Sequence, residues 1–282
     1  MIIRELLRKG VEELKAAGSE SYRLDAVLLL MKACNLSRVQ VITMDDSEVD
    51  PDRAQEFERL ISARAKGHPV AHLLGERDFW ELTLKVNEHT LIPRPDTEVL
   101  VEQALKTVSS HDFGPAPRVL DLGTGSGAII LSIKHSAGHI IASAVERSAQ
   151  ALEGARENAR LNNLEVHFYE GSWFEPLPQG SCFDLIVSNP PYIEEHDPHL
   201  TQGDVRFEPL TALVSGQDGL DDIRHIADKA GQYLVKGGYL LFEHGYNQAE
   251  AVRALLSSSG FDNVSTVKDL GGNDRVTMGQ LR

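Results

Sequence analysis

The fold is decided by the stretch Arg118-Val119-Leu120-Asp121-Leu122-Gly123-Thr124-Gly125-Ser126-Gly127-Ala128. Its first five residues predict a buried strand, and the next five predict a glycine turn. A helix is expected from Ala128 to about His135. A strand that passes through a glycine turn into a helix is typical of the first unit of a doubly wound α/β sheet.

The same order of strand, turn and helix continues along the chain. Further strands are expected at 139–145, 166–169, 182–187 and 238–243, helices at 148–162, 218–235 and 247–259, and a terminal hairpin at 264–268 and 275–280. Ligands of a doubly wound sheet bind outside the carboxyl ends of its strands. The residues that directly follow the strands are therefore the candidates for chemistry.

The most informative of these positions is Ser188-Asn189-Pro190-Pro191-Tyr192, which follows an apolar strand. Its two prolines stop the strand, fix two φ angles and donate no N–H. The Asn189 side-chain oxygen and the Pro190 carbonyl are therefore expected to be rigid acceptors, with Tyr192 as a flat aromatic wall. The simpler alternative is a Pro-Pro turn whose asparagine caps a strand end.

Two fixed acceptors suit a planar –NH2 group on an sp² carbon, such as a carboxamide or the exocyclic amine of adenine. They can bind both N–H donors and leave the face of the nitrogen open to an electrophile. Acceptors that strengthen as this poorly nucleophilic nitrogen becomes tetrahedral stabilise the transition state selectively. Asn189, Pro190 and Tyr192 are the predicted catalytic residues, and Pro191 is expected to join them in substrate binding.

The glycine turn indicates a nucleotide cofactor. Gly123, Gly125 and Ala128 fit the relaxed dinucleotide pattern, and Glu146 lies about 20 residues further on, where an acidic side chain binds ribose hydroxyls. This pattern fits a nicotinamide nucleotide as well as S-adenosyl-L-methionine.

Three observations favour S-adenosyl-L-methionine. Gly127 lets the backbone approach the methionine part, and Asp121 is placed to meet its ammonium group. The turn at Asn189 suits methylation of an amine, whereas hydride transfer has no need for paired carbonyl acceptors.

The charge of the chain argues against nucleic acid as a partner. Residues 93–282 carry 26 acidic and 15 basic side chains, and residues 1–92 carry 16 and 13, for a net charge of −14. Such acidity provides no general footprint for phosphate backbones. No membrane span, signal peptide or metal-type cysteine spacing is present, so a cytoplasmic protein is expected. A monomer is the further expectation.

The first part of the chain has a different pattern. Residues 1–76 carry helical periodicity and predict a small substrate-docking domain. A β-hairpin linker is expected at 77–92, followed by the catalytic domain at 93–282. In the stretch that begins this domain, Arg94 is flanked by two prolines, which make a rigid mount for a guanidinium that we expect to bind substrate. The alternative function of this stretch is to cap the helix at 98–108.

Taken together, these stretches resemble the bacterial HemK/PrmC family of peptide chain release factor glutamine methyltransferases. The resemblance covers nearly the whole chain and rests on five motifs. These are Phe79-Trp80, residues 91–98 (Leu-Ile-Pro-Arg-Pro-Asp-Thr-Glu), residues 121–128, residues 188–193 and Val205-Arg206-Phe207-Glu208-Pro209. The Asn-Pro-Pro-Tyr turn is shared with many amino-methylating enzymes, whereas residues 91–98 together with Phe-Glu-Pro are far more restrictive.

The resemblance implies a class I methyltransferase fold and methyl transfer from S-adenosyl-L-methionine to the side-chain amide (N5) of the glutamine in the Gly-Gly-Gln motif of release factors. It places the cofactor against Gly123, Thr124, Gly125, Ser126, Gly127, Glu146, Trp173 and Asn189. It places the glutamine against Asn189 to Tyr192.

The chain departs from the family pattern at two positions. Glu146 stands where aspartate is common, a change that keeps the carboxylate. Ser172 stands where an aspartate often precedes Trp173, which bears on contact with the adenine amine. Trp173 itself is expected to cover the adenine ring, or else to be an ordinary core residue.

Two rival functions follow from the same residues. A DNA or RNA amino-methyltransferase could use the same turn, but a flipped base needs a cationic approach surface. The second rival is a non-catalytic scaffold that kept the fold. The intact glycine turn and the Asn189 turn argue against it.

Overall fold

A computed structural model describes all residues, 1–282, and divides them into two compact units. The first unit holds Met1–Glu76 together with Thr201–Phe207, and the second holds Arg77–Leu200 and Glu208–Arg282. None of the helices is both long and apolar enough to cross a membrane.

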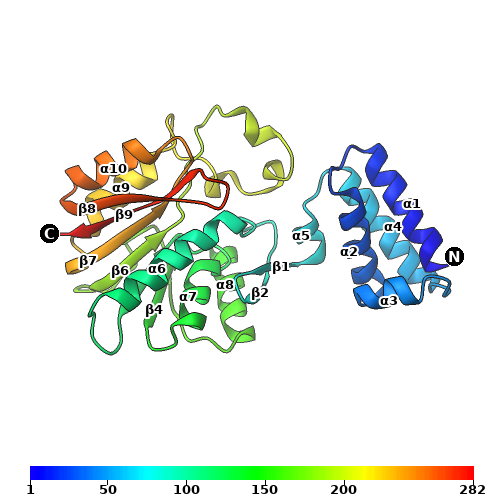
Figure 1. The fold of residues 1–282 in the computed structure, drawn as a ribbon, viewed down its shortest axis with the longest axis horizontal. Helices are drawn as coiled ribbons and strands as arrows, with labels where there is room; N and C mark the ends of the chain where they lie inside the picture. Colours follow the sequence, from blue (N-terminus) through cyan, green and yellow to red (C-terminus); the bar gives the residue numbers. More distant parts are fainter. The chain divides into compact units, whose positions relative to one another are not determined.

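The first unit is helical. Its helices are α1 (Ile3–Ala16), α2 (Tyr22–Cys34), α3 (Arg38–Thr43), α4 (Pro51–Ala65) and α5 (Val70–Leu74) (Figure 1). Helix α4 begins where expected, because Asp50 accepts hydrogen bonds from the first backbone N–H groups and a proline opens the first turn. Leu6, Leu30 and Phe57 are almost fully buried in the common core.

A segment that is distant in sequence completes this unit. Asp204 accepts a hydrogen bond from Arg64 at 2.8 Å, and Arg64 also donates to Asp25 at 2.7 Å. The Arg64 and Asp25 side chains are only 12% and 6% exposed. A contact across 140 residues leaves no local pattern, so the sequence did not predict that this segment packs with the first unit.

The second unit is built on a seven-stranded sheet of order β5-β4-β3-β6-β7-β9-β8. Its strands are β3 (Arg118–Leu122), β4 (Ile141–Glu146), β5 (His167–Glu170), β6 (Phe183–Ser188), β7 (Leu234–Glu243), β8 (Phe261–Lys268) and β9 (Asp274–Leu281). The first five strands in the order are parallel, and β9 and β8 are antiparallel. The predicted doubly wound fold with a terminal hairpin is confirmed.

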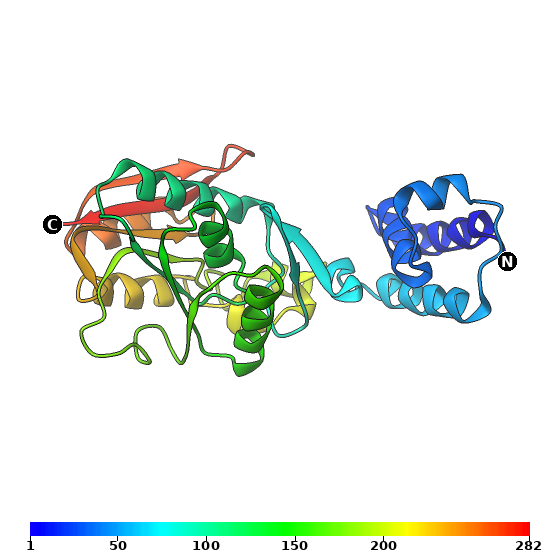
Figure 2. The same ribbon diagram turned by 90° about the horizontal axis from the view of Figure 1, so that it is seen from below.

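Helices cover both faces of this sheet (Figures 1 and 2). Val119 and Leu185 point into a core with α6 (Glu98–Ser110), α7 (Ala128–Ser136) and α8 (Ala149–Leu161). Their neighbours Leu120 and Ile186 point into the opposite core, with α9 (Asp221–Ala230) and α10 (Ala249–Ser258). Because successive side chains of a strand point to opposite faces of the sheet, an unbroken apolar run contributes residues to both cores.

A two-stranded hairpin of β1 (Glu76–Phe79) and β2 (Leu82–Lys85) precedes this domain. The end of the linker expected at 77–92 is irregular, because the Ile92 N–H donates to the Glu208 carboxylate and not to a neighbouring strand. Four short 3-10 turns complete the structure, at Pro95–Thr97, Pro198–Thr201, Val205–Phe207 and Leu210–Ala212.

Two mid-helix glycines provide a matched stability test. A Cβ on Gly10 of α1 would lie 2.6 Å from Phe57, whereas a Cβ on Gly154 of α8 would meet nothing within 4 Å. Gly10→Ala should therefore lower the free energy of unfolding by about 1–3 kcal/mol. Gly154→Ala should raise it by about 0.5–1 kcal/mol, because alanine costs less backbone entropy in a helix. Urea denaturation followed by circular dichroism measures both, and shifts of the same sign would contradict the packing described.

Candidate active site

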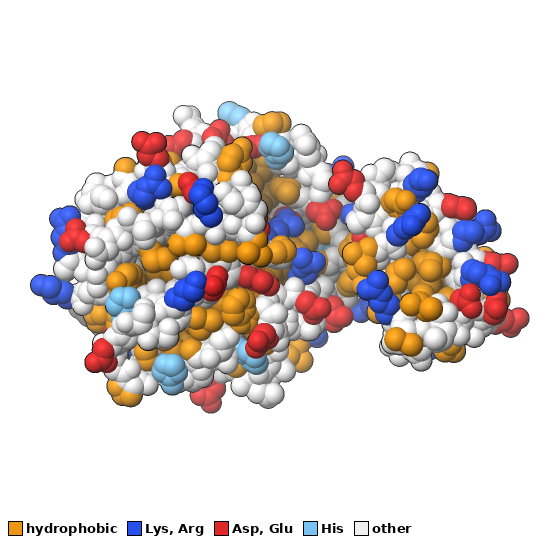
Figure 3. Space-filling view, viewed as in Figure 1, with side chains coloured by type: hydrophobic (Ala, Val, Ile, Leu, Met, Phe, Trp, Pro, Cys, Tyr) orange, Lys and Arg blue, Asp and Glu red, His pale blue; other side chains and the backbone are white.

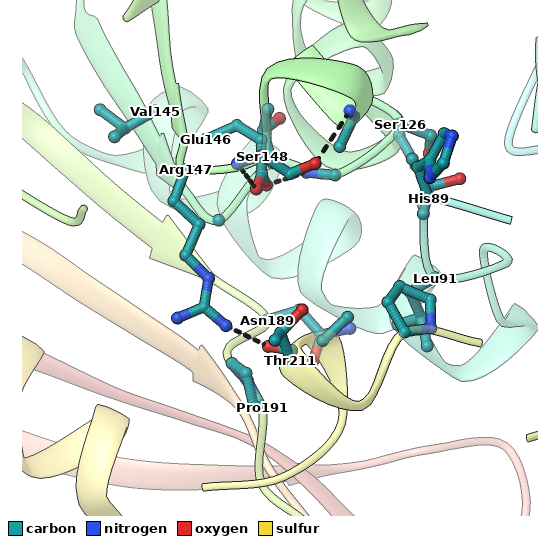
Figure 4. A pocket seen from close by; sticks show the side chains of 18 of the residues that line it. His89, Leu91, Ser126, Val145, Glu146, Arg147, Ser148, Asn189, Pro191 and Thr211 are labelled. Carbon is teal, nitrogen blue, oxygen red and sulfur yellow. Dashed lines mark hydrogen bonds between the residues drawn. The ribbon is translucent and has the colours of Figure 1, made fainter. Parts of the chain in front are cut away.

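A cavity opens at the carboxyl ends of β3, β4 and β6 (Figure 4). Its wall combines the glycine turn, the end of β4 and the Asn189 turn with three segments from elsewhere in the chain, within 89–97, 171–173 and 209–212. The lining residues that had been expected there are Gly123, Thr124, Gly125, Ser126, Glu146, Trp173, Asn189 and Pro191. The sheet thus brings most of the predicted cofactor residues together, as the carboxyl-end rule requires.

The glycine turn needs its glycines at two positions. Gly127 has φ 85° and directly precedes α7, and a Cβ there would lie 2.9 Å from Leu131. Gly123 has φ 73°, and a Cβ there would lie 3.3 Å from the Trp173 ring. Both backbone conformations favour glycine, and the two close approaches leave little room for a side chain.

Glu146 ties the turn to the end of β4. Its carboxylate oxygens accept from the Gly125 N–H and the Ser148 N–H, each at 2.9 Å. A carboxylate has about four acceptor positions. Glu146 can therefore bind ribose hydroxyls while it holds the turn.

Asp121 lies beneath the turn, fully buried, and does not line the cavity. One carboxylate oxygen accepts from the Thr124 hydroxyl at 2.6 Å. The other makes no well-formed hydrogen bond, although the backbone N–H of Ile130 lies near the carboxylate. Burial raises the pKa of Asp121 to about 7. A buried acceptor without a well-formed hydrogen bond fits the ammonium group of S-adenosyl-L-methionine.

Asn189 and Pro190 are held from both sides. Before them, the Ser188 hydroxyl donates to the Leu122 carbonyl at 2.7 Å. After them, the Tyr192 N–H donates to the Leu213 carbonyl at 3.1 Å. No hydrogen bond within the chain engages the Asn189 side chain or the Pro190 carbonyl oxygen. The turn therefore presents two fixed acceptors that the fold itself does not use.

The two most restrictive sequence motifs meet in the structure. Glu208, from the Phe-Glu-Pro motif, is buried and accepts hydrogen bonds from the Arg94 guanidinium and from the Ile92 N–H, the latter at 3.0 Å. Pro209, directly after Glu208, lines the cavity. Arg94 itself does not line the cavity. It contacts Glu208, which directly precedes the lining residue Pro209.

Arg147 was missed by the sequence analysis. Its guanidinium donates to the Thr211 carbonyl at 2.7 Å and reaches across the cavity beside Asn189 (Figure 4). His89, Thr90, Leu91, Pro93 and Thr97 also line the cavity from the segment before α6. The only local signal for Arg147 was its place directly after Glu146, since the other side of its contact is far away in sequence.

Two family models match the chain. The PrmC N-terminal domain matches residues 5–75, and the Methyltransferase small domain matches residues 96–205. Among solved structures, the hMettl16 catalytic domain in complex with the MAT2A 3'UTR hairpin 1 has a TM-score of 0.57 at 15% identity, over 78% of this chain and 80% of that one. A T. thermophilus 16S rRNA N2 G1207 methyltransferase with AdoMet and guanosine has a TM-score of 0.51 at 20% identity, over 73% and 50%. At these identities the likeness concerns the fold alone.

Curated relatives cover the whole chain. It is 47% identical to a protein of Vibrio cholerae named Release factor glutamine methyltransferase, over 99% of this chain and 97% of that protein. It is 45% identical to the protein of the same name from Escherichia coli K12, over 97% of each. The resemblance inferred from the motifs is confirmed, and this chain belongs to the release factor glutamine methyltransferase family.

Proposed function

We propose that this chain transfers a methyl group from S-adenosyl-L-methionine to the side-chain amide nitrogen (N5) of the glutamine in the Gly-Gly-Gln motif of peptide chain release factors. Relatives at 42–48% identity carry the matching name. The observation that carries the chemistry is a pair of unused acceptors in the turn after β6. These are the side chain of Asn189, which lines the cavity, and the carbonyl of Pro190, the next residue in the chain.

The cavity residues fit the cofactor part by part. Glu146 binds the ribose hydroxyls, and the glycine turn lies along the methionine part of the cofactor. The Asp121 carboxylate attracts the ammonium group of that methionine part. Trp173, which packs on Gly123, covers the adenine ring, with Ser172 beside it. When bound, the cofactor supplies an electrophilic methyl group.

The Asn189 turn holds the substrate amide. One amide N–H donates to the Asn189 side-chain oxygen and the other to the Pro190 carbonyl, so the nitrogen lone pair faces the methyl group. As the lone pair would form the new N–C bond, the bond of the methyl group to sulfur would break and its electron pair would stay on sulfur. The N–H groups become more acidic in this step, and both hydrogen bonds strengthen. The nitrogen then loses one proton to solvent. Pro191 and Tyr192 pack on the amide plane, and Arg94 stabilises the wall through Glu208.

A nucleic-acid substrate is the second candidate, because two structural neighbours of the same fold are described with RNA or guanosine. The charge distribution disfavours it. On the face shown in Figure 3, basic side chains are interspersed with acidic ones, and the chain as a whole has a net charge of −14. A protein substrate fits this surface better than a nucleic acid does. The enzyme would act on it as a monomer in the cytoplasm.

The test is transfer of labelled methyl groups to a purified class I release factor, with a Gln→Ala variant of its Gly-Gly-Gln loop as control and total RNA and DNA in parallel. Label on the unchanged factor alone is the expected result. Label on nucleic acid would keep the fold and overturn the substrate.

Asn189→Ala removes one of the two acceptors. We expect kcat to fall by about 10²–10³, the usual effect of deleting one fixed transition-state hydrogen bond. The thermal unfolding midpoint should stay near that of the unchanged protein, because no hydrogen bond of the fold involves this side chain. Asn162→Ala, at the end of α8, is the matched control and should keep full activity. An Asn189→Ala variant with unchanged turnover would refute the acceptor mechanism.

Asp121 makes cofactor affinity depend on pH. Its pKa of about 7 means that it is mostly protonated at lower pH, and only the carboxylate attracts an ammonium group. Affinity measured by calorimetry should therefore rise by up to about tenfold per pH unit below pH 7, and level off above it. Stability of the cofactor-free protein runs the other way and falls as the pH rises towards 7, because the folded state favours the protonated acid. Asp121→Asn should flatten the affinity profile. It should only reduce the slope of the stability profile, because burial also raises the pKa of Glu243 to about 7. An unchanged slope of the affinity profile would show that another group binds the ammonium.

A further inference from the structure

A buried polar cluster lies behind Tyr192. Glu243, the last residue of β7, is 1% exposed and accepts a hydrogen bond from the Tyr192 hydroxyl at 3.3 Å. The Thr97 hydroxyl lies near the Glu243 carboxyl, and Thr97 also lines the cavity. Neither the sequence analysis nor the proposed chemistry gives Glu243 a role.

This cluster lowers the free energy of unfolding, so a contribution to stability does not explain its presence. Glu243 Oε2 and Thr97 Oγ1 are both buried without a well-formed hydrogen bond. The nearby cation, Arg275, hydrogen-bonds to Asp269 at 3.0 Å and lies 3.4 Å from Asp96, so it forms no direct pair with Glu243. A buried carboxyl that lacks a direct counter-ion costs free energy that a neutral side chain would avoid. Such groups are typical of functional sites.

The geometry of Tyr192 shows what the carboxyl can do. The backbone of Tyr192 is fixed on both sides, because its N–H donates to Leu213 and its carbonyl accepts from the Gln248 side chain at 3.0 Å. The ring is left with one polar contact, the hydroxyl on Glu243. Burial and the Glu243 charge raise the pKa of Tyr192 well above its usual value. Its hydroxyl therefore remains protonated and donates, so Tyr192 serves as a wall and not as a base.

We propose that Glu243 is a positioning residue, which anchors the Tyr192 hydroxyl and so fixes the ring and the Asn189 turn against the substrate amide. This inference rests on the proposed function. Displacing a bound group by about 1 Å can cost about a hundredfold in rate. Loss of the anchor should therefore lower kcat. It should leave the affinity for the cofactor unchanged, because Glu243 does not line the cavity.

The test compares Glu243→Ala, Glu243→Gln and Tyr192→Phe. We expect Glu243→Ala to lower kcat about 10- to 100-fold, with the cofactor dissociation constant changed less than about twofold. Glu243→Gln keeps an acceptor oxygen of the same shape and should recover most of the rate. Tyr192→Phe removes the other half of the same hydrogen bond, so the Tyr192→Phe/Glu243→Ala double variant should be no slower than the slower single variant.

Asp184→Asn is the matched control. Asp184 is also a buried carboxylate, at the opposite end of β6, where it accepts from the Arg118 N–H at 2.7 Å. Its loss should lower stability and leave kcat unchanged. Three outcomes would overturn the proposal. The kcat losses of the two single variants could multiply in the double variant, Glu243→Ala could keep full activity, or Asp184→Asn could lose as much kcat as Glu243→Ala.

A second readout needs no substrate. The ¹³Cζ resonance of Tyr192, assigned by its disappearance in Tyr192→Phe, should shift in Glu243→Ala and stay in place in Asp184→Asn. If the unchanged enzyme labelled no release factor but this shift appeared, the anchor would stand and the proposed substrate would fall. An unmoved resonance would refute the anchor itself.

Discussion

The Pro-Pro turn after β6 is the constraint on which the catalytic unit depends. Proline lacks an N–H and fixes φ, so the chain leaves the sheet with acceptors that cannot be paired by continuing the strand. The structure holds this turn at Ser188 and at Tyr192 while leaving the Asn189 side chain and the Pro190 carbonyl unused. A rigid pair of acceptors beside a nucleotide cavity is suited to an amide that must be oriented before it reacts.

Contacts between distant segments keep that arrangement in place. The Arg94 guanidinium and Glu208 connect the segment before α6 to the segment after the Asn189 turn, and Arg147 connects the end of β4 to Thr211. Pro209 and Thr211 thereby form a wall of the cavity. The more restrictive motifs therefore largely build and support the cavity wall, whereas the turn at Asn189 is where we propose that the chemistry takes place.

Much of this could be read from the sequence, and the exceptions have physical causes. Periodicity and glycine placement predicted the doubly wound sheet, and the carboxyl-end rule brought Gly123, Glu146 and Asn189 together. Helix α3 was missed because six residues give no periodic pattern, although its Ser37–Gln40 capping box was a usable signal. Arg147, and the packing of the Thr201–Phe207 segment with the first unit, were missed because the partners lie far away in the chain.

The most direct test of this account is a crystal structure of the enzyme with the demethylated cofactor product and a release factor. We expect the amide nitrogen of the Gly-Gly-Gln glutamine to lie within hydrogen-bond distance of both Asn189 Oδ1 and the Pro190 carbonyl oxygen, about 2.7–3.2 Å, with its open face towards the cofactor sulfur. A glutamine side chain bound elsewhere, or one whose N–H groups face solvent, would contradict the central claim.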